Sequence, residues 1–111
     1  MKLSIEKEYD YIPEWNGNKN DEQPIVFHLR GITDIEREKC ITKKYVDGNV
    51  EMHTNESQLF RYAVQSIENL EINERQIKTA AEFLALPGLS GLFSEIIVEV
   101  ITNTARKDLK N

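Results

Sequence analysis

The side chains best suited to metal binding or nucleophilic catalysis are few in this chain: His28, His53 and Cys40. A zinc site needs three or four ligands at short spacings, and neither histidine has a second His or Cys at such a spacing. A catalytic thiolate needs a base or cation beside it, whereas Cys40 precedes Ile41 in an expected helix. The sequence therefore predicts no metal site and no cofactor, with Cys40 as a small buried side chain.

Glutamate pairs offer the next candidate chemistry, which is general acid–base catalysis. Glu68 and Glu71, and likewise Glu95 and Glu99, are spaced so that each pair shares one face of an expected helix. On a helix surface such pairs face water, which is the more frequent situation for paired carboxylates. The segment 88–91, Gly-Leu-Ser-Gly, lacks the Lys-Ser/Thr of a phosphate-binding loop and indicates a corner between helices. We therefore expect no catalytic residues and no enzyme activity.

Length and charge narrow the classes of partner. The chain has 111 residues, the size of one domain, and a formal net charge of −5. The acidic balance disfavours nucleic acid, and the aromatic residues Tyr9, Tyr11 and Trp15 are interleaved mostly with acids rather than bases. No apolar run approaches the roughly 20 residues that a membrane helix needs. These features predict a soluble protein whose partners are other proteins, with no nucleic acid and no membrane.

The elements expected first along the chain are two strands. Alternation of apolar and polar residues predicts strands over 2–12 and 24–30, with His28 on the polar side of the second. Pro13 ends the first strand because proline has no N–H to donate, and Asn16-Gly17 begins a turn. The two strands are expected to pair as an antiparallel hairpin.

Helical periodicity dominates the rest of the chain and predicts four helices, over 34–45, 56–70, 80–86 and 91–104. Two of them begin at capping boxes, formed by Thr33 with Glu36 and by Thr79 with Glu82. Asp47-Gly48 indicates a turn, after which 50–53 could form a short strand. The predicted fold class is α+β and mostly helical, in a single domain 1–111 with a β-hairpin region 1–31, a helical region 32–104 and a charged tail 105–111.

The predicted core combines the apolar faces of these elements. Its members are Ile25, Phe27, Leu29, Leu59, Phe60, Ala63, Val64, Ile67, Phe83, Leu84, Phe93, Ile96, Ile97, Val100 and Ile101.

Short motifs in a fixed order give the chain a resemblance. The stretch Pro13-Glu14-Trp15-Asn16-Gly17-Asn18 is followed by a strand and by a helix that starts at Thr33-x-x-Glu36. Further motifs follow in order: Ile67–Leu70 (Ile-Glu-Asn-Leu), Ile77–Thr79 (Ile-Lys-Thr), Leu92–Ile96 (Leu-Phe-Ser-Glu-Ile) and the closing Lys110-Asn111. Over nearly the whole chain, this order resembles the tail assembly chaperones and small tail proteins of long-tailed bacteriophages.

The resemblance implies a non-catalytic protein that acts in the cytoplasm of a bacterial host. Members of this group bind the tape-measure protein, and tail-tube subunits, while the phage tail is built. The alternative is a structural phage protein that stays in the virion, such as a neck, tail-terminator or tube-associated module. A homo-oligomer is compatible with both.

The hypothesised partner surface lies on the last two expected helices. These helices carry more apolar surface than a small domain easily covers, and a groove between them could take the apolar face of a partner helix. Glu82, Glu95 and Glu99 would attract a basic partner to it. Trp15 is expected to cover one end of the core, or to be a binding residue if it is exposed. The hypothesised partner-binding residues are Trp15, Phe83, Leu86, Leu89, Leu92 and Val98.

Overall fold

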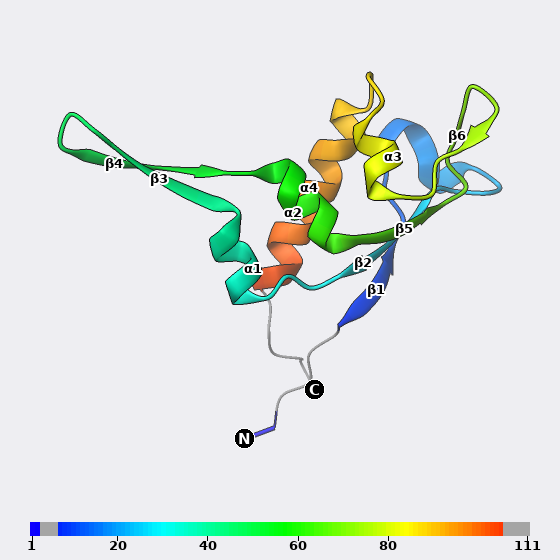
Figure 1. Ribbon diagram of the computed structural model, residues 1–111. Coiled ribbons are helices and arrows are strands. Elements are labelled where there is room, and N and C mark those ends of the chain that lie inside the picture. Colours follow the sequence, from blue (N-terminus) through cyan, green and yellow to red (C-terminus); the bar gives the residue numbers. More distant parts are fainter. Residues whose placement is uncertain (3–6, 106–111) are drawn as a thin grey trace.

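A three-stranded antiparallel sheet and the helices packed on one of its faces form the body of the protein (Figure 1). The computed structural model describes residues 1–2 and 7–105. The sheet has the order β1-β2-β5, with β1 at Glu8–Tyr11, β2 at Val26–Arg30 and β5 at Val64–Glu68. The helices of the body are α2 (Glu56–Ala63), α3 (Ala80–Leu84) and α4 (Ser90–Ala105), and a short 3-10 segment, η1 (Trp15–Asn20), connects β1 to β2.

The predicted hairpin of the first two strands is present. Tyr11 pairs with Phe27 and Tyr9 with Leu29, in the antiparallel register that the alternation implies. The predicted first strand began at residue 2; the pairing starts at Glu8, and 3–6 lie outside the described residues. Phe27 and Leu29 are buried under the helices, so the face of the sheet on which these two side chains lie is the one that faces the core.

The opposite face of the sheet carries an ionic cluster around His28. Its Nδ1 contacts the carboxylate of Asp10 on β1, and its Nε2 contacts the carboxylate of Glu68 near the end of β5. One half-exposed imidazole therefore links all three strands. The hydrogen bond to Asp10 raises the pKa of His28 above its ordinary value of 6.5; Glu68 adds to the rise and burial opposes it.

This cluster predicts a pH dependence of stability. Because folding raises the pKa of His28, the folded state binds the proton more tightly than the unfolded chain does. The stabilisation is fully present below about pH 6.5, the unfolded value, and is lost as the pH rises through the higher folded pKa. Urea denaturation across this range should show stability falling with increasing pH, and His28→Gln should remove that component. An unchanged profile in the variant would contradict the assignment.

The expected helix over 56–70 is wrong in its second half. Helix α2 ends at Ala63, and the chain enters β5 at Val64 without a loop. The pairing of β5 with β2 is irregular: Ile67 lies opposite Phe27, but Val64 rather than Gln65 lies opposite Leu29. Gln65 is thus the extra residue of a β-bulge, and the bulge lets Val64 and Ile67 both face the core.

The expected helix over 34–45 is also wrong in its second half. Helix α1 spans only Asp34–Lys39, and Cys40 ends it. The chain then forms a hairpin of β3 (Ile41–Val46) and β4 (Asn49–Thr54), which extends the short strand considered for 50–53. Asp47 and Gly48 both have positive φ, as a two-residue turn between twisted strands requires. We call this hairpin the arm, because it projects away from the body (Figure 1).

Both capping boxes form as predicted. The Thr33 hydroxyl accepts the N–H of Glu36 and the Glu36 carboxylate accepts the N–H of Thr33; Thr79 and Glu82 repeat the pattern at α3. Glu36 also makes a two-point ion pair with Arg30, at 2.8 and 2.7 Å between nitrogen and oxygen. The hydrogen bond from Arg30 is the main reason that the pKa of Glu36 falls to about 2. Helix α1 is therefore anchored to the end of β2.

The mostly helical fold class is therefore wrong. The part of the chain that the structure describes forms one three-stranded sheet, two two-stranded sheets and five helices, most of them short. The third sheet is a small hairpin of β6 (Glu71–Ile72) and β7 (Arg75–Gln76), in a segment where no strand was predicted. Helix α3 ends two residues earlier than predicted, whereas α4 matches its predicted span within one residue at each end.

The predicted core is largely confirmed. Ile101, however, is exposed on α4, and Ile25, Leu84 and Phe93 are only partly buried. Core residues that the prediction omitted are Ile32, Cys40, Leu70, Ile77, Leu89 and Leu92. Burial of Cys40 agrees with its predicted role as a small apolar side chain, and that burial raises the pKa of its thiol.

Candidate protein-binding groove

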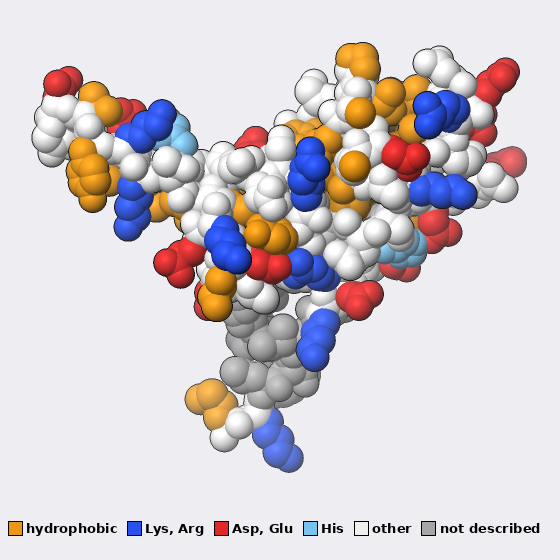
Figure 2. All heavy atoms as spheres, in the orientation of Figure 1, with side chains coloured by type: hydrophobic (Ala, Val, Ile, Leu, Met, Phe, Trp, Pro, Cys, Tyr) orange, Lys and Arg blue, Asp and Glu red, His pale blue; other side chains and the backbone are white. Residues whose placement is uncertain are grey.

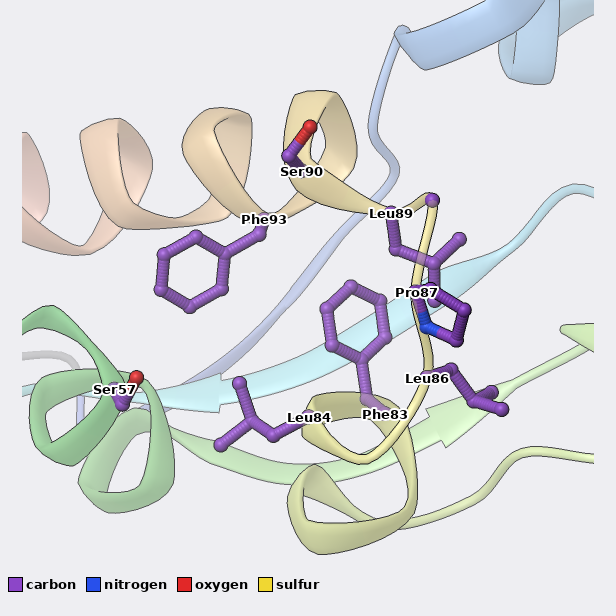
Figure 3. A pocket seen from close by; sticks show the side chains of 9 residues that line it. Ser57, Phe83, Leu84, Leu86, Pro87, Leu89, Ser90 and Phe93 are labelled. Atoms are coloured by element: carbon purple, nitrogen blue, oxygen red, sulfur yellow. The ribbon is translucent and has the colours of Figure 1, made fainter.

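An apolar hollow opens on the surface of the body where α3 turns into α4. Figure 3 shows its side chains arranged around a common space that reaches the first turn of α2. Its volume is about 350 Å³. The lining residues are Ser57, Phe83, Leu84, Leu86, Pro87, Gly88, Leu89, Ser90 and Phe93, and we call this hollow the groove.

Local sequence explains why the chain leaves an open space here. Helix α3 is short because Pro87 cannot continue it, and Gly88 takes a positive φ of 83° that turns the chain. The carbonyl of Leu89 then accepts the N–H of Phe93, which starts α4. Two helices that meet across so tight a corner diverge from it, and the side chains of Leu84, Leu86 and Phe93 remain partly exposed between them.

A cluster of aromatic rings supports the groove from below. Phe60 stacks on Phe83 with ring centroids 4.9 Å apart and lies 5.3 Å from Phe93. Phe27 meets Phe60 and Phe83 edge to face. Such close-packed rings resist collapse of the hollow, so the groove is a preformed feature of the fold.

The expected acidic rim is only partly available. The carboxylate of Glu82 accepts the N–H groups of Lys78 and Thr79, and the bond from Lys78 is the leading reason that its pKa is lowered. Glu82 is therefore anionic at neutral pH and can attract a basic partner. Glu95 instead accepts hydrogen bonds from the N-terminal loop, and neither Glu95 nor Glu99 lines the groove.

The N-terminal loop is fastened to α4 through Glu95. Its carboxylate accepts the Tyr11 hydroxyl at 2.7 Å and the backbone N–H groups of Glu14 and Trp15 at 2.7 and 3.0 Å. The buried Asn18 closes the loop on itself: its side chain bonds the carbonyl of Pro13 and both backbone polar groups of Ile25. The Pro-Glu-Trp-Asn-Gly-Asn stretch is thus a structural clasp between β1, β2 and α4.

The predicted partner-binding residues divide between three places. Phe83, Leu86 and Leu89 line the groove, although Phe83 is buried in its floor. Leu92 is buried in the core and offers no surface in this conformation, and Val98 is 63% exposed on α4 but does not line the groove. Trp15 is partly buried against the core, with its indole beside Gly91, which agrees with the expected covering role.

Sequence reasoning missed six of the nine lining residues, namely Ser57, Leu84, Pro87, Gly88, Ser90 and Phe93. Periodicity assigned Leu84 and Phe93 to the core because both fall on apolar helix faces, and it cannot tell a filled corner from an open one. The available signal was the Pro-Gly pair inside Leu84-Ala-Leu-Pro-Gly-Leu89, which places a sharp turn between two apolar segments.

The lining of the groove is suited to binding an apolar ligand. Only Ser57 and Ser90 bring hydroxyl groups to it, and its other lining side chains are apolar.

Across the described residues, no group of three or more His, Cys, Asp or Glu could hold a metal ion. No helix within 1–2 and 7–105 is long and apolar enough to cross a membrane. Comparisons of the chain with known protein families, with curated proteins and with solved structures find no match.

Proposed function

We propose that this protein is a non-catalytic assembly chaperone of the phage-tail type, which holds an apolar helical segment of another protein in its groove. The tape-measure protein is the proposed partner, with tail-tube subunits as further partners, in the cytoplasm of a bacterial host. The observation that carries the proposal is the preformed groove, open to the surface and lined mainly by Leu, Phe and Pro. The order of motifs along the chain supports the choice of family.

The physical basis is burial of apolar surface. An amphipathic helix presents residues at i, i+3, i+4 and i+7, and such a row can enter a groove between two helices. A tape-measure chain before assembly is expected to be long and helical with exposed apolar faces, and covering them prevents aggregation. The anionic Glu82 precedes the groove residue Phe83 on α3, and its charge favours a basic partner segment.

A structural protein of the phage particle is the second candidate, and one observation favours it. The arm projects from the body, as expected for a subunit that reaches into a neighbour within an assembly (Figure 1). The two candidates differ in where the protein is found after assembly. A chaperone is absent from purified virions, whereas a structural module is retained in them.

A pull-down with the tape-measure protein tests the groove. Leu86→Ser should abolish binding because it removes an apolar contact from the groove wall. Val98→Ser is the matched control: it replaces an exposed apolar residue on α4 by the same polar residue outside the groove, and binding should persist. Thermal melts of both variants should stay near wild type, since neither side chain is in the buried core.

The proposal fails if Leu86→Ser binds like the wild type while remaining folded. It also fails if Val98→Ser abolishes binding and Leu86→Ser does not, because the partner would then sit on the outer face of α4.

A further inference from the structure

The N-terminal loop contains an asparagine followed by glycine, Asn16-Gly17, which is the pairing most prone to deamidation. Of the nine asparagines in the chain, only Asn16 precedes a glycine. Asparagine is a thermolabile residue, and glycine has no Cβ to shield its own backbone nitrogen. Both residues are exposed, at the end of the body opposite the arm (Figure 1), and Figure 2 shows charged side chains of both signs over that end. Water therefore reaches the pair.

Deamidation at this pair needs no reactant other than water. The backbone nitrogen of Gly17 attacks Cγ of Asn16, so that a new C–N bond closes a succinimide ring while the bond from Cγ to the side-chain nitrogen breaks. That nitrogen leaves as ammonia and takes the proton that the Gly17 nitrogen gives up. Water then opens the ring at Cγ, which gives aspartate, or at the main-chain carbonyl, which gives isoaspartate. Nothing is oxidised or reduced, and the rate depends on the geometry of the two neighbouring residues.

The folded loop holds the pair in a geometry that does not react. Asn16 has a φ of 54° and a ψ of 34°, and Gly17 has a φ of 73° and a ψ of 16°, as in a type I′ turn. Ring closure needs a strongly negative ψ at Asn16, whereas at 34° the Gly17 nitrogen points away from the Asn16 side chain. The Gly17 N–H also donates to the carbonyl of Glu14 at 3.2 Å. The loop must therefore open before Asn16 can react.

The clasp controls that opening, because it fixes the chain on both sides of the pair. On one side, the backbone N–H groups of Glu14 and Trp15 donate to the carboxylate of Glu95. On the other side, the buried side chain of Asn18 makes three hydrogen bonds to the backbone. Local opening of such a loop requires less free energy than global unfolding, so it is the route by which Asn16 becomes reactive.

We propose that Asn16 is the deamidation site of this protein, that the clasp sets the rate of the reaction, and that conversion to isoaspartate releases the clasp irreversibly. Isoaspartate routes the backbone through the former side chain and adds one methylene between the two fixed sides of the loop. The extra length prevents the donors of the clasp from returning to their acceptors together. The reaction thus limits the lifetime of the clasped form.

Mass spectrometry of the full chain, aged in mildly alkaline buffer, tests the site. Peptide mapping should place the mass gain of deamidation at Asn16, and the folded chain should react at least about tenfold more slowly than the same chain unfolded in urea. Asn16→Gly is the control, because glycine accepts the positive φ and has no amide to lose. It should stay unmodified in this loop. Earlier reaction at another asparagine, or equal rates in the folded and unfolded chains, would overturn the proposal.

A matched pair of glutamates on α4 tests control by the clasp. Glu95→Ala removes the acceptor and should speed deamidation of Asn16 by at least about tenfold, since opening then breaks none of the bonds to that carboxylate. Glu99→Ala, one turn along the same helix, should change the rate by less than about twofold. Equal effects would contradict control by the clasp.

Low concentrations of urea distinguish local opening from global unfolding. Local opening exposes little surface, so the rate in the wild type should change little with urea below the unfolding transition. A rise as steep as that of global unfolding would mean that Asn16 reacts only from the unfolded chain, and the clasp would then not set the rate.

The two products separate the effect of charge from that of backbone length. Asn16→Asp adds the same charge without the extra methylene, and its Trp15 fluorescence should stay close to wild type. The isoaspartate form, isolated by chromatography, should instead show the fluorescence of Glu95→Ala. Native fluorescence in that form would contradict release of the clasp. No tail protein is needed, so failure here leaves the proposed groove function standing, and failure of the pull-down leaves the deamidation site standing.

Discussion

Replacement of Phe60 by alanine is expected to lower the free energy of unfolding by about 3–5 kcal/mol, the largest effect of any single substitution considered. The Phe60 ring is fully buried and lies at the centre of the aromatic cluster, in contact with Phe27, Phe83 and Phe93. Its removal leaves a cavity beneath the groove that these rings cannot fill without leaving their own positions. Urea denaturation measures the loss.

The matched control for this prediction is Val98→Ala on α4. Val98 is exposed, so its truncation should change the free energy of unfolding by no more than about 0.5 kcal/mol. A loss below about 1 kcal/mol for Phe60→Ala would mean that the helices repack around the gap, and the groove would then not be preformed.

Replacement of Glu95 by alanine is expected to cost about 2–3 kcal/mol, because one carboxylate accepts three hydrogen bonds from the N-terminal loop. Two of the donors are backbone N–H groups, which cannot follow a shortened side chain. Burial and the neighbouring Glu95 raise the pKa of the Tyr11 hydroxyl, so this donor stays protonated at any ordinary pH. Loss of the clasp should also free Trp15, whose fluorescence reports the change.

Glu99→Ala is the control for the clasp, since Glu99 lies one turn further along α4 and the three hydrogen bonds of the clasp all end on Glu95 instead. It should leave both stability and Trp15 fluorescence close to wild type. Glu95→Gln separates charge from shape, since the amide keeps one acceptor oxygen but not the second. An equal loss for Glu95→Ala and Glu99→Ala would show that the acidic character of α4 matters rather than the clasp.

Local signals in the sequence predicted those parts of the fold that depend on neighbouring residues. The capping boxes at Thr33 and Thr79 require only contacts within one turn, and both formed. The pairing of β1 with β2 followed from alternation and from the single loop between them. Helix α4 followed from an apolar pattern long enough to exclude a strand.

The errors arose where a strand imitated helical spacing. Val64 and Ile67 are three positions apart, which is the spacing of one helix face, and they continue the pattern of Phe60 and Ala63. In the structure the bulge at Gln65 produces the same spacing in a strand. The bulge exists because of pairing with β2, a contact distant in sequence, so no local pattern could reveal it.

The arm was missed for a different reason. Asp47-Gly48 between Tyr45-Val46 and Asn49-Val50 is a strong hairpin signal, but the capping box at Thr33 favoured a helix that continued past Cys40. The β-branched pair Ile41-Thr42 marked the end of that helix.

The groove was predicted only in part. The sequence indicated the corner between the last two helices, but whether the side chains at that corner close over it or leave it open depends on how the helices pack.

The clasp at Glu95 has a consequence for the order in which this protein can fold. Tyr11 and Glu95 are separated by 84 positions. The first strand can therefore make all of its native contacts only after α4, near the other end of the described chain, has formed. Contacts between such distant segments slow folding because a long loop must close before they form. The aromatic cluster likewise includes Phe93 on α4, so during synthesis the cluster stays incomplete until α4 has emerged from the ribosome. In that interval the nascent chain is itself an aggregation-prone client, of the kind that its mature form is proposed to hold.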